Sequence, residues 1–329
     1  MKKFLNSPGA FLEESLDGFA AAHADIVTLG EERKFVRRKV LTPGKVALIS
    51  GGGSGHEPLH AGFIGVGMLD AACPGQVFTA PTPDQMIAAV ESVDQGKGVL
   101  FIVKNYEGDI MNFEMAAEML DGRCASIVTD DDVAVERSTY STGRRGVAGT
   151  LVVEKMVGAA AEAGWERAAL QRLGMAVNHR TRSMGVALTS CTVPAAGKPN
   201  FAIGDDEMEM GVGIHGEPGR QRVRLAPARD VAQEMLAAIL TDLAPRRGSE
   251  ALVFVNGFGG TPLIELYLLY NEAVRILDGA GVKAARSLVG SYVTSLDMAG
   301  ASITLSLLEG EAVKLWDAPV HTAALRWGV

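Results

Sequence analysis

His56 and Glu57 directly follow a glycine-rich stretch, GGGSG (residues 51–55), that itself succeeds an apolar run. Glycines there let backbone amides approach a ligand closely, and amides at a helix start attract phosphate or hydroxyl oxygens. A tight strand-to-helix turn would need the same glycines. The stretch lacks the Lys-Ser/Thr ending of a nucleoside-triphosphate loop and fits the dinucleotide-binding spacing poorly. The two titratable residues therefore favour a site for proton transfer over a plain turn.

Lys104 and Asp109 form a second charged pair, in the segment VKNYEGDIMNFE (103–114). Lys104 ends the clearest apolar run of the chain, and Asp109 opens the next amphipathic stretch. Taken singly, Lys104 fits a surface charge and Asp109 fits a helix N-cap. Because parallel strands end at the same edge of a sheet, we expect both residues to lie beside the GGGSG loop, where α/β proteins bind their ligands.

His215 lies between glycines in GVGIHGEPG (211–219), whose HGEPG resembles the earlier GHEP. A lone histidine is more often a structural hydrogen-bonding group than a catalyst. The small neighbours leave this imidazole accessible, and a neutral imidazole is a nucleophile. His215 is therefore a candidate for covalent chemistry, whereas no partner pattern surrounds His60, His179 or His321.

The remaining polar clusters carry weaker signals. Residues 130–132 are three consecutive aspartates, which lack the spacing of a metal-binding loop and predict a solvated turn with helix caps, so we expect no metal site. Arg144 and Arg145 fit a role in steering phosphate or a partner and a plain charged loop equally well. The cysteines are odd in number and match no metal or redox spacing, which predicts buried thiols in a reducing compartment; they are Cys73, Cys124 and Cys191.

Short apolar runs alternate with amphipathic stretches in the first half of the chain, which predicts a parallel α/β sheet. The expected strands there are residues 45–50, 69–74, 99–104 and 124–129. The expected helices are residues 58–68, 82–98, 109–120 and, interrupted near Gly164, 147–181. The second half predicts helices near 228–241 and 262–278 and strands at 251–257, 283–290 and 301–308. We therefore expect two α/β domains, residues 1–185 and 186–329, each with a mostly parallel or mixed sheet flanked by helices.

Composition limits the classes of function. The chain has 329 residues, of which 47% are hydrophobic and 21% charged, an ordinary balance for a globular protein of two domains. Its formal net charge of -8 argues against binding nucleic acid or an anionic membrane. No apolar run reaches 18 residues and the N-terminus has no signal-peptide core, so we expect no membrane span and a cytoplasmic protein.

Long segments of the chain resemble, in order, the K subunit of dihydroxyacetone kinases, the DhaK family. They are GGGSGHEPLHAGF, PTPDQM, VLFIVKNYEGDIMNFEMAAE, DDDVAVE, GRRGVAGT, SCTVPAAGKP, DDEMEMGVGIHGEPGR, NGFGGTPLIELY and TSLDMAG. The resemblance runs from about residue 8 to the C-terminal region. It implies two α/β domains assembled as a homodimer, and a triose pocket lined by Gly53, Ser54, Gly55 and His56.

The same resemblance implies a role for each charged residue. Lys104 and Asp109 would contact the substrate, and His215 would form a covalent hemiaminal with its ketone carbon. His56 would be the general base, with Asp109 assisting at the hydroxyl that accepts phosphate. Such a bond admits ketones and aldehydes and excludes glycerol, and it fixes the reacting hydroxyl for phosphoryl transfer.

No segment predicts a nucleotide site, which the family places on a helical L subunit or L domain. We therefore expect no cofactor on this chain and glycerone kinase activity only with a separate L partner. That partner would carry ATP with Mg²⁺, or ADP with Mg²⁺ that a phosphotransferase-system M-type protein rephosphorylates. Three alternatives stay open: a kinase subunit for another small ketose such as a tetrulose, a non-catalytic triose sensor or coactivator, and a free-standing ATP-binding kinase.

Overall fold

The computed structural model describes residues 2–134, 141, 143–217 and 219–329, which form two compact units. The N unit contains residues 2–129, 150–176 and 314–329, and the C unit contains residues 130–149 and 177–313. The single boundary predicted at 185/186 differs from this division. It would cut strand β8 (Thr181–Ala187), which pairs along its whole length with β13 (Gly300–Leu307). Each unit is an α/β structure, as expected, but is assembled from separated chain segments.

The N unit is built on a six-stranded sheet in the order β1-β2-β5-β3-β6-β7. Four neighbouring strands run parallel: β5 (Ala71–Val77), β3 (Ala47–Ser54), β6 (Val99–Lys104) and β7 (Cys124–Thr129). Strands β1 (Val27–Leu29) and β2 (Val36–Arg38) add an antiparallel edge. Strands β3 and β6 are buried along their whole length, as central parallel strands are, and this burial explains their continuous runs of apolar residues and glycine.

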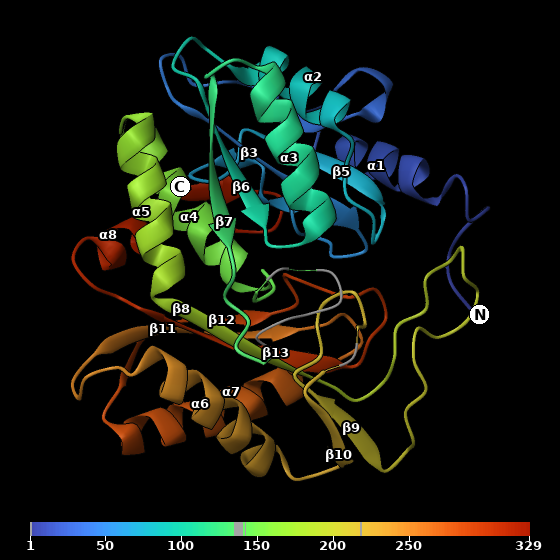
Figure 1. Cartoon of the computed structure of the whole chain (residues 1–329), viewed down its shortest axis with the longest axis vertical. Helices are drawn as coiled ribbons and strands as arrows, with labels where there is room; N and C mark the ends of the chain where they lie inside the picture. The colour runs from blue at the N-terminus through green and yellow to red at the C-terminus, as the bar shows by residue number, and fades with distance from the viewer. Residues whose placement is uncertain (1, 135–140, 142, 218) are drawn as a thin grey trace. The chain divides into compact units, whose positions relative to one another are not determined.

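Helices α2 (Pro83–Val93) and α3 (Glu107–Met119) pack together against this sheet (Figure 1). The other N-unit helices are α1 (Phe11–Ala22), α4 (Gly149–Glu162), α5 (Arg167–His179) and α8 (Ala312–Asp317). Three of them extend into the C unit by a few residues: the first residue of α4, the last three of α5 and the first two of α8. Short 3-10 turns cover Glu31–Arg33 and Ala61–Phe63. A small second sheet has the order β15 (Arg326–Trp327), β14 (Val320–Thr322) and β4 (Gly65–Val66).

The helix predicted at residues 58–68 is wrong. This segment contains only the 3-10 turn and strand β4. Gly65 and Gly67 have φ angles of 150° and 83°, and a Cβ on Gly65 would lie 2.1 Å from the carbonyl oxygen of His321, where β4 pairs with β14. The helix-like spacing of apolar residues therefore reflects burial, while the glycines serve a close approach between strands.

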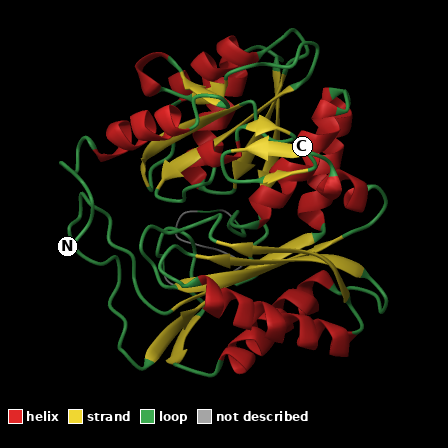
Figure 2. Ribbon diagram, turned by 180° about the vertical axis from the view of Figure 1, so that it is seen from behind, coloured by secondary structure: helices red, strands yellow, loops and turns green. Residues whose placement is uncertain are grey.

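The C unit is built on a sheet in the order β10-β9-β8-β13-β11-β12. Besides β8 and β13, its strands are β9 (Glu207–Met210), β10 (Gln221–Arg224), β11 (Glu250–Gly257) and β12 (Lys283–Gly290). All pairs are antiparallel except β11 with β12, so this sheet is mixed. Helices α6 (Ala228–Leu243) and α7 (Leu263–Ala280) lie side by side on one face of it (Figure 2).

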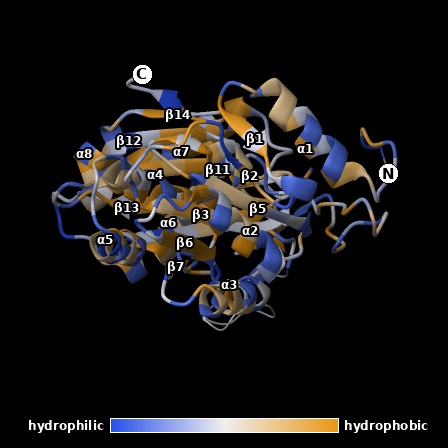
Figure 3. Cartoon of the chain, turned by 90° about the horizontal axis from the view of Figure 1, so that it is seen from above, coloured by the Kyte–Doolittle hydropathy of each residue, from blue (hydrophilic) through white to orange (hydrophobic). Residues whose placement is uncertain are grey.

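Apolar residues concentrate in the strands of both sheets, whereas α1 shows both hydrophilic and apolar stretches (Figure 3). In the described part of the chain, no helix is both long and apolar enough to cross a membrane.

Candidate active site

The carboxyl ends of β3 and β6 bring the glycine stretch and Lys104 to one edge of the N-unit sheet. The two strands are parallel neighbours, with Ser50 opposite Ile102. The expectation of a shared edge is thereby confirmed, although the first glycines belong to β3 itself. A Cβ on Gly52 would lie 2.2 Å from Lys104 Nζ, so the missing side chain provides the space for the ammonium group.

Lys104 and Asp109 form a buried ion pair. Lys104 Nζ lies 3.6 Å from Asp109 Oδ2 and donates a hydrogen bond of 3.2 Å to the carbonyl oxygen of Gly51. The lysine is 0% exposed and the aspartate 4%. Asp109 is the third residue of α3, where the helix dipole also favours a carboxylate. A surface role for the lysine is therefore excluded, and the pair has the burial expected of a functional site.

His60 is a site residue that sequence reasoning missed. Its Nε2 lies 2.8 Å from Lys104 Nζ, and its Nδ1 lies 2.6 Å from Glu154 Oε1 on α4 and 3.0 Å from Ser50 Oγ. Burial is the main reason that the pKa of His60 falls well below its ordinary value, and the charges of Lys104 and His56 lower it further. Burial likewise raises the pKa of Glu154 to about 8, against the lowering effect of Lys104 and Ser50.

His56 is buried at the end of the glycine stretch, with its ring stacked on Phe78 at a centroid distance of 5.0 Å. The amide of Gly55 donates to Glu57 Oε2 at 2.9 Å, and the Ser54 hydroxyl donates to the carbonyl oxygen of Gly75 at 2.7 Å. A carboxylate of the chain itself thus occupies one loop amide, and no α-helix follows the loop. The helix expected after the loop is therefore absent, and the loop amides do not form a helix start.

His215 lies in the C unit, in the loop after β9. Its backbone amide donates to Glu217 Oε2 at 2.9 Å, and its Nδ1 lies 3.9 Å from Glu217 Oε1. Although burial opposes ionisation of Glu217, the interactions with His215 and the charge of Arg145 lower its pKa to about 2. The arrangement is an imidazole beside a carboxylate that is ionised at neutral pH. The meeting of His215 with the N-unit residues stays a prediction.

The structure assigns Arg145 and two of the aspartates to a buried cluster of the C unit. Arg145 is 0% exposed; it pairs with Asp132 Oδ2 at 2.6 Å and lies 3.5 Å from Glu217 Oε1. Asp131 accepts hydrogen bonds from the amides of Val147 and Gly149 at the start of α4. The expected capping is thus present, but a solvated turn is wrong for both buried aspartates, and a plain charged loop is wrong for Arg145.

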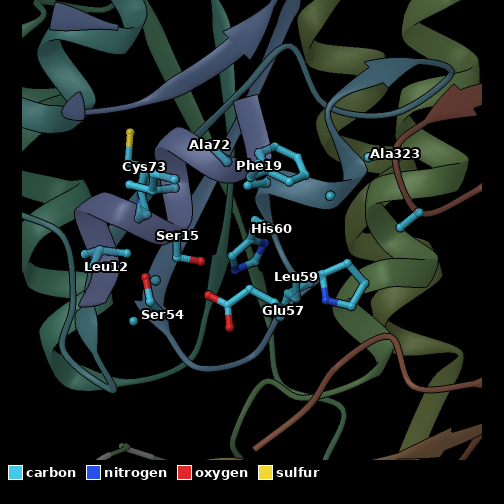
Figure 4. Close-up of a pocket in the computed structure, with 18 of the residues that line it drawn as sticks. Leu12, Ser15, Phe19, Ser54, Glu57, Leu59, His60, Ala72, Cys73 and Ala323 are labelled. Atoms are coloured by element: carbon cyan, nitrogen blue, oxygen red, sulfur yellow. The ribbon is translucent and has the colours of Figure 1, made fainter. Parts of the chain in front are cut away.

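A cavity of about 590 Å³ lies beside this site within the N unit. It is lined by α1 and by residues 52–54, and the side chains of Glu57 and His60 border it together with Ser15 and Ser54 (Figure 4). Lys104 does not line it, so the His60 ring connects the cavity wall to the buried ammonium. Among the described residues, no group of three or more His, Cys, Asp or Glu side chains could hold a metal ion.

Replacing Gly52 with alanine should destabilise the N unit, because the new methyl group would push the Lys104 ammonium away from its three partners. Overpacking of this kind costs about 1–3 kcal/mol of unfolding free energy, measurable by chemical denaturation. Gly18→Ala is the matched control, since no atom lies within 4 Å of a Cβ there and α1 should gain stability. Equal effects of the two substitutions would contradict the proposed packing.

The pKa of Glu217 predicts a pH-dependent contribution to stability. A carboxylate with a pKa of about 2 in the folded chain and an ordinary value of 4.5 stabilises the fold above pH 4.5 and loses this effect as the pH falls toward 2. The stability difference, the unfolding free energy of the wild type minus that of Glu217→Gln, should therefore be constant above pH 4.5. It should decrease as the pH is lowered from 4.5 to 2. A difference independent of pH over this range would exclude the low pKa.

Comparison with known proteins gives consistent matches over the whole chain. A family model, the Dak1 domain, matches residues 17–324. The dihydroxyacetone-binding subunit DhaK of a PTS-dependent dihydroxyacetone kinase of Listeria innocua is 49% identical over 328 residues, which cover 98% of this chain and 100% of that protein. A D-erythrulose kinase of Mycolicibacterium smegmatis is 38% identical over 332 residues, 100% of this chain and 57% of that protein.

Solved structures show the same fold. A dihydroxyacetone kinase operon co-activator superposes with a TM-score of 0.90 at 32% identity, covering 95% of this chain and 97% of its own. The dihydroxyacetone kinase of C. freundii superposes with a TM-score of 0.88 at 34% identity, covering 99% of this chain and 60% of its own. The chain therefore belongs to the Dak1 family, within the DhaK group of dihydroxyacetone kinase subunits.

Proposed function

We propose that this chain is the dihydroxyacetone-binding subunit of a dihydroxyacetone kinase. The observation that carries the proposal is the buried Lys104–Asp109 pair at the strand end that bears Gly53, Ser54, Gly55 and His56. The 49% identity to a subunit named for this ligand supports it. In this proposal the glycine stretch lines the triose pocket, and the buried pair hydrogen-bonds the hydroxyls of the ketone.

The ketone is held covalently on His215. The lone pair of the imidazole Nε2 attacks the carbonyl carbon, the carbonyl π electrons move to oxygen, and that oxygen takes a proton. The ring then releases its Nδ1 proton, so a hemiaminal forms without loss of water. Glu217, 3.9 Å from Nδ1 and ionised, stabilises the positive charge that the ring carries after the attack. Glycerol has no carbonyl and is excluded.

Phosphoryl transfer then needs deprotonation and alignment of one ketone hydroxyl. His56 takes the hydroxyl proton with Asp109 assisting, and the chain's main contribution is positioning. The phosphoryl group comes from a nucleotide with Mg²⁺ on a separate L subunit, as ATP or as ADP recharged by a phosphotransferase-system M-type protein. We further propose that the chain forms a homodimer in the cytoplasm.

The comparisons favour two specific alternatives. The D-erythrulose kinase, at 38% identity, points to a four-carbon ketose as substrate, because a carbonyl anchor does not read chain length. The co-activator, with a TM-score of 0.90, points to a triose sensor with no turnover. Retention of His56 and Asp109 beside the glycine stretch favours the kinase.

Native mass spectrometry of the chain with dihydroxyacetone should show an adduct whose added mass equals one intact ketone, because a hemiaminal forms without loss of water. His215→Ala should abolish the adduct, whereas His179→Ala, at an exposed position of α5, should retain it. Glycerol should give none. An adduct that survives His215→Ala would disprove the covalent role.

Phosphorylation assays should separate the kinase from the alternatives. The purified chain, an L subunit and a phosphoryl donor should together convert dihydroxyacetone to its phosphate, and the chain alone should bind no nucleotide in calorimetry. Higher kcat/KM for a tetrulose would reassign the substrate. An adduct without any phosphorylated product would favour the sensor, and tight nucleotide binding by the chain alone would contradict the need for a partner.

A further inference from the structure

Lys104 and two buried side chains behind it, His60 and Glu154, form a continuous row of polar contacts. Glu154 on α4 contacts His60 at 2.6 Å, and His60 contacts Lys104 of β6 at 2.8 Å. Glu154 and Lys104 are 0% exposed and His60 is 6% exposed. Ionisable groups are rarely buried to this degree unless each has a partner. Each contact must therefore join a donor to an acceptor.

The chemistry of the ammonium group fixes the direction of the hydrogen bonds that join Lys104, His60 and Glu154. A lysine ammonium only donates, so the Nε2 of His60 must accept from it. A neutral imidazole then carries its proton on Nδ1 and donates it to Glu154 Oε1. The Ser50 hydroxyl donates to the carbonyl oxygen of Ile102 at 2.6 Å, which leaves its oxygen to accept from Nδ1 as well.

The contacts of the ammonium group fix the orientation of Lys104. Two of its protons face His60 Nε2 at 2.8 Å and the Gly51 carbonyl at 3.2 Å. The third faces Asp109 Oδ2 at 3.6 Å, too far for a hydrogen bond, and in the proposed function it is the proton that a ketone hydroxyl accepts. The ammonium group of a lysine ends a flexible four-carbon stem, and without such contacts its three N–H donors rotate freely. His60 supplies the shortest of the three contacts, and it supplies it only as the Nδ1–H tautomer.

The charges around the chain favour this state at neutral pH. Lys104 and His56 face His60, and together with burial they hold its pKa well below the ordinary value, so the ring is neutral. Glu154 faces Ser50, His60 and Lys104, and its Oε2 is buried with no hydrogen-bond partner in the described structure. Asp109 faces Lys104 from α3. Protonated or ionised, Glu154 keeps an oxygen that accepts from Nδ1.

We infer that His60 and Glu154 are positioning residues, which fix the imidazole tautomer so that Lys104 points into the ketone site. This inference rests on the proposed function, because it concerns the lysine that contacts the substrate there. Neither residue touches the reacting atoms. Their role is to hold the donor in the orientation that phosphoryl transfer needs, as outer-shell partners hold the ligands of metal sites.

A matched pair of substitutions at position 60 tests the acceptor. Glutamine places its amide oxygen near the position of Nε2, whereas asparagine reaches only the position of Nδ1. His60→Gln should keep most of the wild-type kcat, and His60→Asn should lower it roughly 10-fold to 100-fold, the usual effect of losing an orienting partner. Both should still form the His215 adduct at saturating ketone. Equal rates for the two variants would overturn the inference.

Substitutions at Glu154 separate positioning from stability. Glu154→Gln retains the acceptor oxygen and should stay active, whereas Glu154→Leu should lose kcat as His60→Asn does while unfolding at an equal or higher temperature. Lys155→Met is the control, since Lys155 is the next residue of α4, is buried and bonds to the Leu315 carbonyl oxygen at 2.9 Å. It should change stability and not kcat.

Wild-type adduct formation and turnover with the L subunit are measured first. If these fail, the proposed function fails and this inference falls with it. If they succeed and Glu154→Leu turns over like the wild type, only the positioning role is overturned. Should both His60 variants fail to fold, the two Glu154 variants decide the question.

Discussion

The burial of the Lys104 ammonium at the ends of β3 and β6 is the constraint on which the N-unit site depends. A cation withdrawn from water keeps its charge only if hydrogen-bond acceptors and an opposite charge lie around it. Gly52 therefore carries no side chain, α3 begins where Asp109 faces the ammonium, and His60 is backed by Glu154. Several elements thus converge on one nitrogen, which makes the strand end a rigid place to hold a small polar ligand.

Part of this site could be predicted from the sequence. The pairing of Lys104 with Asp109 followed from the rule that parallel strands end at one edge, and the order of strands and helices predicted both α/β sheets. His60 and Glu154 could not be found that way, because they lie 94 positions apart and the segment around His60 has the spacing of a helix. Strand β8 likewise crosses the predicted domain boundary, since pairing with β13 is a long-range choice.

The C unit contributes a different kind of chemistry. Glu217 is kept ionised beside His215, and Arg145 compensates its burial. Sequence spacing singled out the histidine but left a steering role and a plain charged loop equally open for the arginine, because buried ion pairs leave no local pattern. A nucleophile in one unit and a hydrogen-bonding cluster in the other provide, in the proposed function, selection for a carbonyl and selection for hydroxyls. Both selections serve a kinase subunit and a sensor alike, so in the proposed function it is His56 and Asp109 that distinguish a kinase from a sensor.

The covalent bond between His215 and the ketone is tested most directly by carbon-13 NMR. The ligand is dihydroxyacetone labelled with carbon-13 at its carbonyl carbon, and the protein carries nitrogen-15 in its histidine rings. A hemiaminal on His215 predicts a tetrahedral carbon coupled through one bond to a single imidazole nitrogen, a signal that His215→Ala should lack. A labelled carbon that stays trigonal, or a tetrahedral carbon without coupling to nitrogen, would contradict it.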